Sequence, residues 1–338
     1  MSKAVPHSAT AVIGAGSWGT ALACVLSRNG VATTLWGRNA EQVARMQNMR
    51  CNTQYLPNIA FPDALKLNSN LEETVSNNRD ILIAVPSHAF RQTLAQIAPY
   101  LDDHARLIWA TKGFESETGK LLHVVVEEVL GKQYPAAMVS GPTFAAEAAR
   151  GMPTAITLAS TDQNVANDIA KQFHNDNFRV YTSNDITGVE VGGSVKNVLA
   201  IAAGISDALG FGANARAALI TRGLTEVMRL GIALGGQRET IMGLSGLGDL
   251  ILTCTDDQSR NRRFGLALGR GDSVDTAMGG IHQVVEGAFA AEEVVQLATS
   301  LGIEMPISEQ VHRVISGQCT PKQAVSELLH REQKPELA

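Results

Sequence analysis

Through the first half of the chain, short apolar runs rich in β-branched residues alternate with segments whose apolar positions recur at helical spacing. The short runs fit buried strands, and the longer segments fit helices that pack on a sheet. This alternation is typical of βαβ units with a mostly parallel sheet. We therefore predict an α/β domain with strands at residues 11–14, 32–36, 80–85, 105–110, 136–140, 154–158 and 178–182.

The pattern changes between residues 183 and 187, beyond which no further strand is predicted. Long segments rich in Ala, Leu and Gly follow. In one of them Ile220, Val227 and Leu230 recur at helical spacing, while Glu226 falls on another face. Other helices are predicted at 284–300, 307–316 and 321–329. We expect an α/β domain over residues 1–185, an all-α domain over 186–330 and a flexible polar tail over 331–338.

Length and charge agree with this division and exclude some partners. A chain of 338 residues is long enough for two domains of ordinary size. A formal net charge of -5 leaves no basic field for DNA or anionic lipid, so nucleic acid is not expected as a partner. The sequence has no run of about 18 apolar residues, so membrane insertion is not expected either.

The cysteines indicate a reducing environment. They are widely spaced and form neither a CxxC pair nor a metal-ligand pattern, so we expect free buried thiols and no metal site. The first ten residues hold no apolar stretch of the signal-peptide kind. Both features favour a cytoplasmic location. The cysteines are Cys24, Cys51, Cys254 and Cys319.

A glycine-rich loop joins the first predicted strand to a helix of small residues. Gly14, Gly16 and Gly19 form a GxGxxG pattern in this strand-to-helix context. The first glycine permits a tight turn, the second lets a pyrophosphate approach the backbone N–H groups, and the third lets helix and strand pack closely. The alternative is a tight turn without a ligand. We predict a Rossmann-type domain that binds a dinucleotide.

The end of the second predicted strand bears on which dinucleotide is bound. An NAD-specific site carries Asp or Glu at this point to read the ribose, but here the strand leads into Gly37 and Arg38. A guanidinium can pair with a 2'-phosphate and stack on adenine, so Arg38 favours NADP without excluding NAD. A surface arginine is the alternative. His88, after the third strand, receives no role.

Two further loops follow predicted strands. Lys112 comes directly after the strand that ends at residue 110, and the segment from Ser140 to Glu147 begins with a glycine turn, a proline at a predicted helix start and the hydroxyl of Thr143. The carboxyl ends of parallel strands are where ligands of such sheets bind. A solvated lysine is the alternative reading of Lys112 alone, but the two loops together favour a binding site.

Lys196 interrupts the apolar, small-residue helix that begins the second domain. Burying an ammonium without a partner costs several kcal/mol, so the position requires a reason. Gly192 and Gly193 lie one turn earlier and are expected to leave room for a substrate or nicotinamide against the helix. Burial depresses the pKa of a lysine, which suits a general acid or base for a carbonyl and alcohol. A structural salt bridge is the alternative.

Charged groups in the second domain complete the candidate chemistry. A glycine-dense loop ends in Asp249, and Ser259, Arg260 and Asn261 stand at a predicted helix start. A guanidinium, a hydroxyl, an amide and free N–H groups are the chemistry of a phosphate site, although a solvated basic turn is an equal alternative for this run alone. Glu286 stands at another helix start, where capping is the ordinary explanation.

Six segments, in order and spacing, resemble the bacterial-type NAD(P)-dependent glycerol-3-phosphate dehydrogenases over nearly the whole chain: GAGSWGTALA, ATKGF, SGPTFAAE, GGSVKN, GLSGLGDL and QSRNRRFG. The glycine-rich helix followed by Lys and Asn is shared with other β-hydroxyacid dehydrogenases. The resemblance implies cofactor contacts by Ser17, Trp18, Arg38, Lys112, Ala145, Arg260, Val284 and Glu286. It implies triose phosphate contacts by Lys112, Gly141, Thr143, Lys196, Asp249, Ser259, Arg260 and Asn261.

The reaction implied by the resemblance is hydride transfer between NADPH or NADH and dihydroxyacetone phosphate, with Lys196 as general acid and with sn-glycerol 3-phosphate as product. Asp249 and Lys112 would orient the substrate and tune that lysine. Apolar C-terminal helices favour a homodimer. Two other readings stay open: a dehydrogenase of hydroxy or keto acids, and a noncatalytic NADP-binding sensor.

Overall fold

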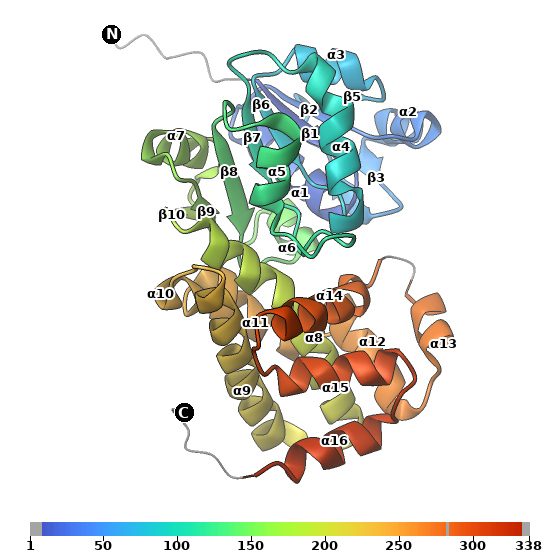
Figure 1. The fold of residues 1–338 in the computed structure, drawn as a ribbon. Coiled ribbons are helices and arrows are strands. Elements are labelled where there is room, and N and C mark those ends of the chain that lie inside the picture. Colours follow the sequence, from blue (N-terminus) through green and yellow to red (C-terminus); the bar gives the residue numbers. More distant parts are fainter. Residues whose placement is uncertain (1–8, 282–283, 333–338) are drawn as a thin grey trace.

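The structure is a computed structural model that describes residues 9–281 and 284–332. Its first part is built on an eight-stranded sheet with the order β10-β9-β8-β7-β6-β1-β2-β5 (Figure 1). Neighbouring strands are parallel except at the β8–β9 pair, so β9 and β10 run against the other six. The strands of this sheet are β1 Thr10–Ile13, β2 Thr33–Trp36, β5 Lys66–Asn68, β6 Asp80–Ile83, β7 Arg106–Trp109, β8 Ala136–Ser140, β9 Thr154–Ala159 and β10 Phe178–Ser183.

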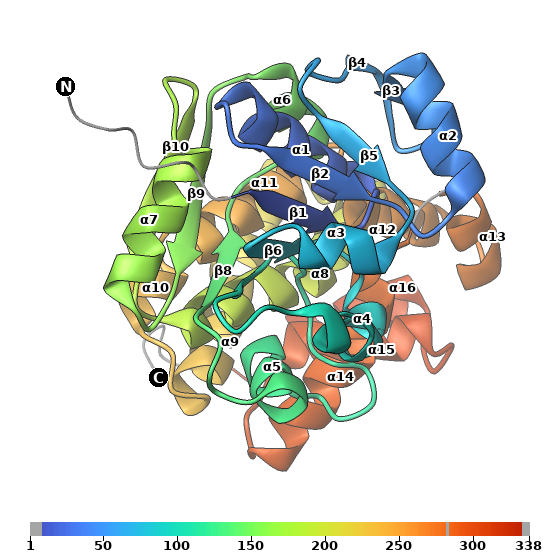
Figure 2. The same cartoon turned by 90° about the horizontal axis from the view of Figure 1, so that it is seen from above.

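Every residue of the central strands β1, β6 and β7 is buried, which fits their mainly apolar sequences and a sheet covered on both faces. Alternate side chains enter two cores: Val12 packs with residues of α1 and α7, and Ile13 packs with residues of α4 and α5. Figure 2 shows α1 on one side of the sheet and α4 and α5 on the other. The helices of this part are α1 Ser17–Arg28, α2 Ala40–Met49, α3 Leu71–Ser76, η1 Ser87–Ala89, α4 Phe90–Ile97, η2 Ala98–Tyr100, α5 Leu122–Leu130, α6 Ala145–Arg150 and α7 Gln163–Phe173.

All seven strands predicted from the apolar pattern are present, with ends that differ by at most two residues. The pattern missed β5 and the antiparallel pair β3 (Cys51–Asn52) and β4 (Leu56–Ala60). These strands are short and at least partly exposed, and β4 contains a proline and Asn58 in the left-handed conformation. They therefore lack the apolar signal on which the prediction relied.

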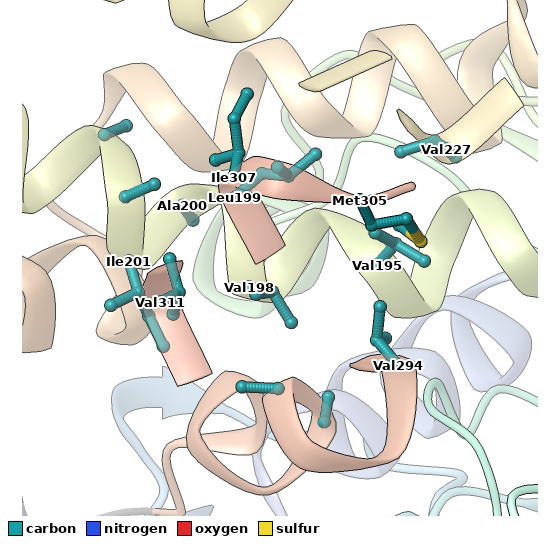
Figure 3. Packing of buried hydrophobic residues seen from close by; sticks show 14 of the residues in the cluster. Val195, Val198, Leu199, Ala200, Ile201, Val227, Val294, Met305, Ile307 and Val311 are labelled. Atoms are coloured by element: carbon teal, nitrogen blue, oxygen red, sulfur yellow. The ribbon is translucent and has the colours of Figure 1, made fainter. Parts of the chain in front are cut away.

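The second part is helical and is organised around α8 (Ile186–Ala208), which is buried along nearly its whole length. Figure 3 shows Val195, Val198, Leu199 and Ile201 of this helix among side chains of its neighbours, including Val227. Length and composition alone would let α8 cross a membrane, but its apolar window is entirely enclosed by protein. The other helices are α9 Gly212–Ala233, α10 Arg238–Ile241, the π-helical turn η3 Leu244–Gly248, α11 Asp249–Thr255, α12 Arg260–Arg270, α13 Val274–Gly279, α14 Glu286–Ser300, α15 Pro306–Ile315 and α16 Pro321–Leu329.

One charged residue of this part is placed differently from the prediction. Glu226 was assigned to a face of its helix away from the apolar positions, but its side chain is buried with only 2% exposed. Its carboxylate accepts hydrogen bonds from the backbone N–H groups of Ile307 and Ser308, at 2.6 and 3.1 Å, and from the Ser308 hydroxyl at 2.9 Å. Glu226 thus satisfies the free N–H groups at the start of α15.

The cysteine prediction is half right. All four cysteines are free thiols, and Cys24 and Cys254 are buried. Cys51 and Cys319 are partly exposed instead. Cys319 follows α15 in a turn at the edge of the helical core, where solvent reaches it. The tail prediction falls mostly on residues 333–338, which lie outside the described residues.

Candidate active site

The glycine-rich loop has the backbone geometry that the sequence pattern predicts. Gly14 has φ of 122°, and a Cβ on it would lie 2.6 Å from the carbonyl oxygen of Ala84. A Cβ on Gly19 would lie 2.0 Å from the Gly14 carbonyl oxygen, so helix and loop touch here. A Cβ on Gly16, by contrast, would meet nothing within 4 Å. Gly16 is the N-cap of α1 and provides no side-chain cap, so the helix N-terminus opens onto free space that fits a pyrophosphate.

The two residues after Gly16 are partly engaged by the protein. The Ser17 hydroxyl donates to the Tyr55 carbonyl oxygen at 2.7 Å. Trp18 packs against two apolar clusters, and its Nε1 is buried without a hydrogen-bond partner among the described residues. The indole N–H is therefore an unsatisfied hydrogen-bond donor at the edge of the loop.

Arg38 lies after β2, at the position where a residue that contacts the adenosine of a dinucleotide is expected. A Cβ on Gly37 would lie 3.3 Å from the Ala15 side chain, so the end of β2 adjoins the glycine-rich loop. The next residue, Arg38, is exposed and forms no hydrogen bond or ion pair with any residue the structure describes. Asn39 caps α2 by accepting from the Gln42 backbone N–H at 3.0 Å. The Arg38 guanidinium is thus available to bind a ligand next to the glycine-rich loop.

The chemical centre is one carboxylate between two lysines. Asp249 is fully buried at the start of α11, and its Oδ1 lies 2.5 Å from Lys196 Nζ. Its Oδ2 lies 2.7 Å from Lys112 Nζ, which comes from the loop after β7. The three side chains therefore join the sheet part, α8 and α11. Two ammonium groups and one carboxylate leave one net positive charge, which suits an anionic substrate.

The environment of Lys196 moves its proton affinity toward neutrality. Only 6% of the residue is exposed, and burial is the main cause that lowers its pKa from 10.5 to about 8. The nearby charge of Lys112 also lowers the pKa, while Asp249 opposes both effects. Lys196 Nζ also donates to the Thr253 hydroxyl oxygen at 3.2 Å. A lysine in this state can give or take a proton near neutral pH.

We expected Gly192 and Gly193 to leave room for a substrate or nicotinamide beside α8, and this expectation is wrong. A Cβ on Gly192 would lie 2.9 Å from the Ser245 carbonyl oxygen and from the Gly246 Cα. A Cβ on Gly193 would lie 2.9 Å from the Ser140 hydroxyl oxygen. Protein therefore fills the space beside both glycines. They let η3 and β8 approach α8 closely, which brings Asp249 within reach of Lys196.

The loop after β8 accepts a hydrogen bond from Lys112 through a backbone carbonyl group. The Gly141 carbonyl oxygen accepts from Lys112 Nζ and from the Thr143 hydroxyl, both at 3.3 Å. A Cβ on Gly141 would lie 2.9 Å from the Ile156 Cα, which explains the glycine. The expected helix start at the proline is wrong, because α6 begins three residues later, at Ala145.

The start of α12 is organised by hydrogen bonds within the protein. Ser259 is the N-cap, and its hydroxyl oxygen accepts from the Arg262 backbone N–H at 3.2 Å. Asn261 Nδ2 donates to the Asn197 side-chain oxygen at 2.9 Å, and its own oxygen accepts from the Gly287 backbone N–H at 2.9 Å. The predicted helix start is confirmed, and it lies beside the residue that follows Lys196.

Arg260, between these two anchored residues, is partly exposed and has no hydrogen-bond or ion-pair partner in the described part of the chain. A free guanidinium at a helix N-terminus can bind a phosphate group, because the guanidinium and the N–H dipoles favour the same charge. The geometry therefore leaves Arg260 as an uncommitted cation at this helix start.

The segment before α14 adjoins the same cluster. Glu286 does not cap its helix through its side chain, and instead accepts from Asn197 Nδ2 at 3.2 Å. Val284 is 39% exposed. Glu286 thus lies beside the neighbour of Lys196, at the junction of α8, α12 and α14.

Sequence reasoning missed two members of the cluster. Thr253 contacts both Lys196 and, through its hydroxyl, the Asp249 carbonyl oxygen at 2.5 Å. Asn197 was quoted within a motif but given no role, and it links α12 to α14. Asp249 and Thr253 are four residues apart and share a face of α11, but the sequence pattern predicted no helix there, so the spacing did not single out the threonine.

Comparisons with known proteins agree with this geometry. Residues 9–166 match the family described as NAD-dependent glycerol-3-phosphate dehydrogenase N-terminus, and residues 185–326 match the family described as the C-terminus of the same enzyme. The chain is 58% identical to a glycerol-3-phosphate dehydrogenase [NAD(P)+] of Thioalkalivibrio sulfidiphilus, over 97% of this chain and 98% of that protein. It is also 58% identical to the enzyme of that name from Nitrosococcus oceani, over 97% and 96% of the two chains.

Solved structures show the same similarity. The crystal structure of glycerol-3-phosphate dehydrogenase from Coxiella burnetii matches with a TM-score of 0.94 and 49% identity, over 97% of this chain and all of that chain. A ketopantoate reductase from Ralstonia eutropha matches with a TM-score of 0.55 and 17% identity, over 95% of this chain and all of that chain, and shares the fold alone. The chain belongs to the NAD-dependent glycerol-3-phosphate dehydrogenase family.

Proposed function

We propose that this protein catalyses the reversible NAD(P)H-dependent reduction of dihydroxyacetone phosphate to sn-glycerol 3-phosphate, the backbone precursor of glycerophospholipids. The observation that carries the proposal is the buried Lys196, which shares one carboxylate with Lys112 and has a pKa of about 8. Family membership supplies the reaction class, and this cluster supplies a proton donor for a carbonyl oxygen together with positive charge for a phosphorylated substrate.

The proposed dinucleotide site lies along the carboxyl ends of the strands. When bound, NADPH or NADH supplies a hydride to the ketone carbon. Gly14, Gly16 and Gly19 present the N-terminus of α1 to the pyrophosphate, and Arg38 faces the adenosine end. By family resemblance, further contacts come from Ser17, Trp18, Lys112, Ala145, Arg260, Val284 and Glu286.

In the proposed mechanism Lys196 donates a proton to the substrate oxygen as the ketone becomes an alcohol, and it accepts that proton in the oxidative direction. Asp249 holds the ammonium in place and offsets part of the cost of burying it. Lys112 lies on the other oxygen of the same carboxylate and makes Lys196 a stronger acid. Fixed charges and fixed geometry in a buried site are the main sources of catalysis in such a step.

The proposed triose phosphate site combines two kinds of residue. Arg260 is an uncommitted cation that receives the phosphate group, with the N-terminus of α12 behind it. Other groups position the substrate through atoms that their structural bonds leave available, such as the second N–H of the Asn261 amide. The full proposed set is Lys112, Gly141, Thr143, Lys196, Asp249, Ser259, Arg260 and Asn261.

We further propose a division of labour in which residues 1–185 bind the dinucleotide and residues 186–330 carry the proton donor and most of the phosphate site. The free thiols support a cytoplasmic enzyme. A homodimer is proposed because several large apolar side chains of the helical part are exposed, among them Phe211, Ile232 and Leu329.

A steady-state assay of cofactor absorbance tests the proposal. The purified protein is supplied with NADPH or NADH and with dihydroxyacetone phosphate, unphosphorylated dihydroxyacetone or a short 2-keto acid. We expect turnover with the phosphorylated ketone and far slower turnover with the other two compounds. Preferred reduction of the keto acid would favour the hydroxy-acid reading, and binding of NADPH without reduction of any substrate would favour the sensor.

A further inference from the structure

His88, which the sequence left without a role, contacts a residue from the other end of the chain. Its imidazole ring and the Phe289 ring have centroids 6.4 Å apart and planes tilted by 51°. His88 belongs to η1 of the sheet part, and Phe289 belongs to the first turns of α14 in the helical part. The pair therefore bridges the two parts of the molecule. Figure 1 shows α14 on the side of the helical part that faces the sheet part. Both side chains are exposed, Phe289 by 56%.

The His88 side of this contact is fixed to the catalytic loops. The Val85 carbonyl oxygen accepts from the Thr111 hydroxyl at 2.7 Å, which ties the end of β6 to the residue before Lys112. A Cβ on Gly113 would lie 2.9 Å from the Ser87 hydroxyl oxygen, so the two loops are in close contact. His88 is thus held on a short turn beside the Lys112 loop.

Phe289 lies on α14, which packs against α8, the helix that carries Lys196. Phe289 lies one turn after Glu286, which accepts from Asn197 Nδ2, and Asn197 follows Lys196 on α8. A Cβ on Gly287 would lie 2.5 Å from the Asn197 carbonyl oxygen, so the first turn of α14 packs directly on α8. The two rings are therefore mounted on elements that each touch the cluster around Lys196 and Lys112.

The strand order of the sheet indicates which half of a bound dinucleotide would lie next to the contact between His88 and Phe289. In a sheet with the order found here, the dinucleotide crosses the switch point at β1, with one mononucleotide half on either side. Arg38 follows β2, so the adenosine half lies on that side. The nicotinamide half then lies over the ends of β6 and β7, which lead into His88 and Lys112 respectively.

We propose that His88 and Phe289 form a latch between the two parts of the enzyme that covers the nicotinamide half of the cofactor and slows its release. They are positioning residues: the rings hold the two parts of the molecule together beside the site and take no part in the proton transfer. The inference rests on the proposed dinucleotide site. It adds that the exposed aromatic contact between the two parts helps to set how long the cofactor stays bound.

The test is stopped-flow measurement of NADPH release, followed by cofactor fluorescence, on His88→Ala, Phe289→Ala and the double variant. Each single variant should release NADPH about three- to tenfold faster than the wild type. The double variant should be no faster than the singles, because either change alone opens the same contact. His88→Phe keeps an aromatic ring without an ionisable group and should release NADPH at nearly the wild-type rate. Leu301→Ala is the matched control, since it removes another exposed apolar side chain at the far end of α14.

A second measurement locates the latch. Affinity for adenosine 2',5'-bisphosphate, which lacks the nicotinamide mononucleotide half of NADPH, should be unchanged in both single variants. Release rates equal to the wild type, additive effects in the double variant, or fast release by His88→Phe would each overturn the latch. Equal weakening of the fragment would overturn its placement over the nicotinamide half. Failure of the wild type to bind NADPH would instead contradict the dinucleotide site itself.

Discussion

Lys196 shows how the interior of a protein changes the proton affinity of an ordinary side chain. A lysine in water holds its proton to about pH 10.4. Here burial and the second ammonium of Lys112 lower the pKa of Lys196 to about 8, while Asp249 prevents a larger fall. The carboxylate also keeps the ammonium in the fold, because an unpaired buried charge would be strongly destabilising.

A pH profile follows from this value. Reduction of the ketone requires the protonated lysine, so kcat/KM for dihydroxyacetone phosphate should be level below pH 8 and fall as the pH rises through about 8. Oxidation of glycerol 3-phosphate requires the neutral amine and should rise through the same pH. Removing the second ammonium with Lys112→Met should move both midpoints to higher pH. Profiles with no group titrating between pH 7 and 9 would argue against Lys196 as the acid.

Arg38 is expected to discriminate between the two cofactors. Its guanidinium is exposed beside the glycine-rich loop and has no partner among the described residues. Loss of a charged hydrogen bond of roughly 1.5 to 3 kcal/mol corresponds to about 10- to 150-fold in affinity. Arg38→Ala should therefore weaken NADPH by this factor and NADH much less, as measured by fluorescence titration of each cofactor. An equal loss for both would make Arg38 a platform for adenine.

Arg260 is expected to recognise the phosphate of the substrate. Arg260→Ala should raise KM for dihydroxyacetone phosphate about 10- to 150-fold, and should remove most of the preference over unphosphorylated dihydroxyacetone. Turnover should fall as well if phosphate binding energy orients the ketone. Arg270→Ala, at the other end of the same helix, is the control. Survival of the full preference would place the phosphate elsewhere.

At the scale of elements, α8 carries the site because it is the common packing partner of its neighbours. Small residues on it admit η3, β8 and α12 to close approach. η3 leads into Asp249, which pairs with Lys196, and α12 carries Asn261, which donates to the neighbouring Asn197. Sequence reasoning found Lys196 because a lysine in an apolar helix is conspicuous. It misread Gly192, because close backbone packing and space for a ligand both require a small residue.

Other elements show which features the sequence pattern could predict and which it could not. The central strands were predictable because burial on both faces leaves mainly apolar runs, whereas β5 lies at the sheet edge and carries no such run. Thr253 was missed because a threonine in a helix has no distinctive pattern until its neighbours in space are known. Glu226 was misplaced for a related reason: its partners are backbone groups 81 and 82 residues away.

The Glu226 contact predicts a stability effect without a catalytic one. Glu226→Ala would leave two buried N–H groups of α15 without acceptors, which should lower the free energy of unfolding by about 2 to 4 kcal/mol. Urea denaturation measures this change. The exposed Glu292→Ala, on α14, should change stability by no more than about 0.5 kcal/mol. A loss for Glu226→Ala as small as that of the control would mean that water replaces the carboxylate.

At the scale of the whole molecule, the reaction depends on two parts that meet at one cluster. The dinucleotide loop belongs to the sheet, Lys196 belongs to the central helix of the other part, and Asp249 connects Lys196 to the Lys112 loop of the sheet part. In the proposed mechanism, therefore, the glycine-rich loop of the sheet part and the proton donor on α8 have separate roles. A substitution at Lys196 should separate cofactor binding from turnover.

The most direct test of the account is Lys196→Ala, assayed for turnover and titrated with NADPH in the same preparation. Loss of a positioned general acid lowers turnover by about 10²- to 10⁴-fold, while the glycine-rich loop and Arg38 remain in place. Lys322→Ala, an exposed lysine on α16, controls for loss of a positive charge. We predict that Lys196→Ala loses turnover by this factor and binds NADPH with nearly the wild-type affinity. Near-normal turnover in the folded variant would contradict the role of Lys196.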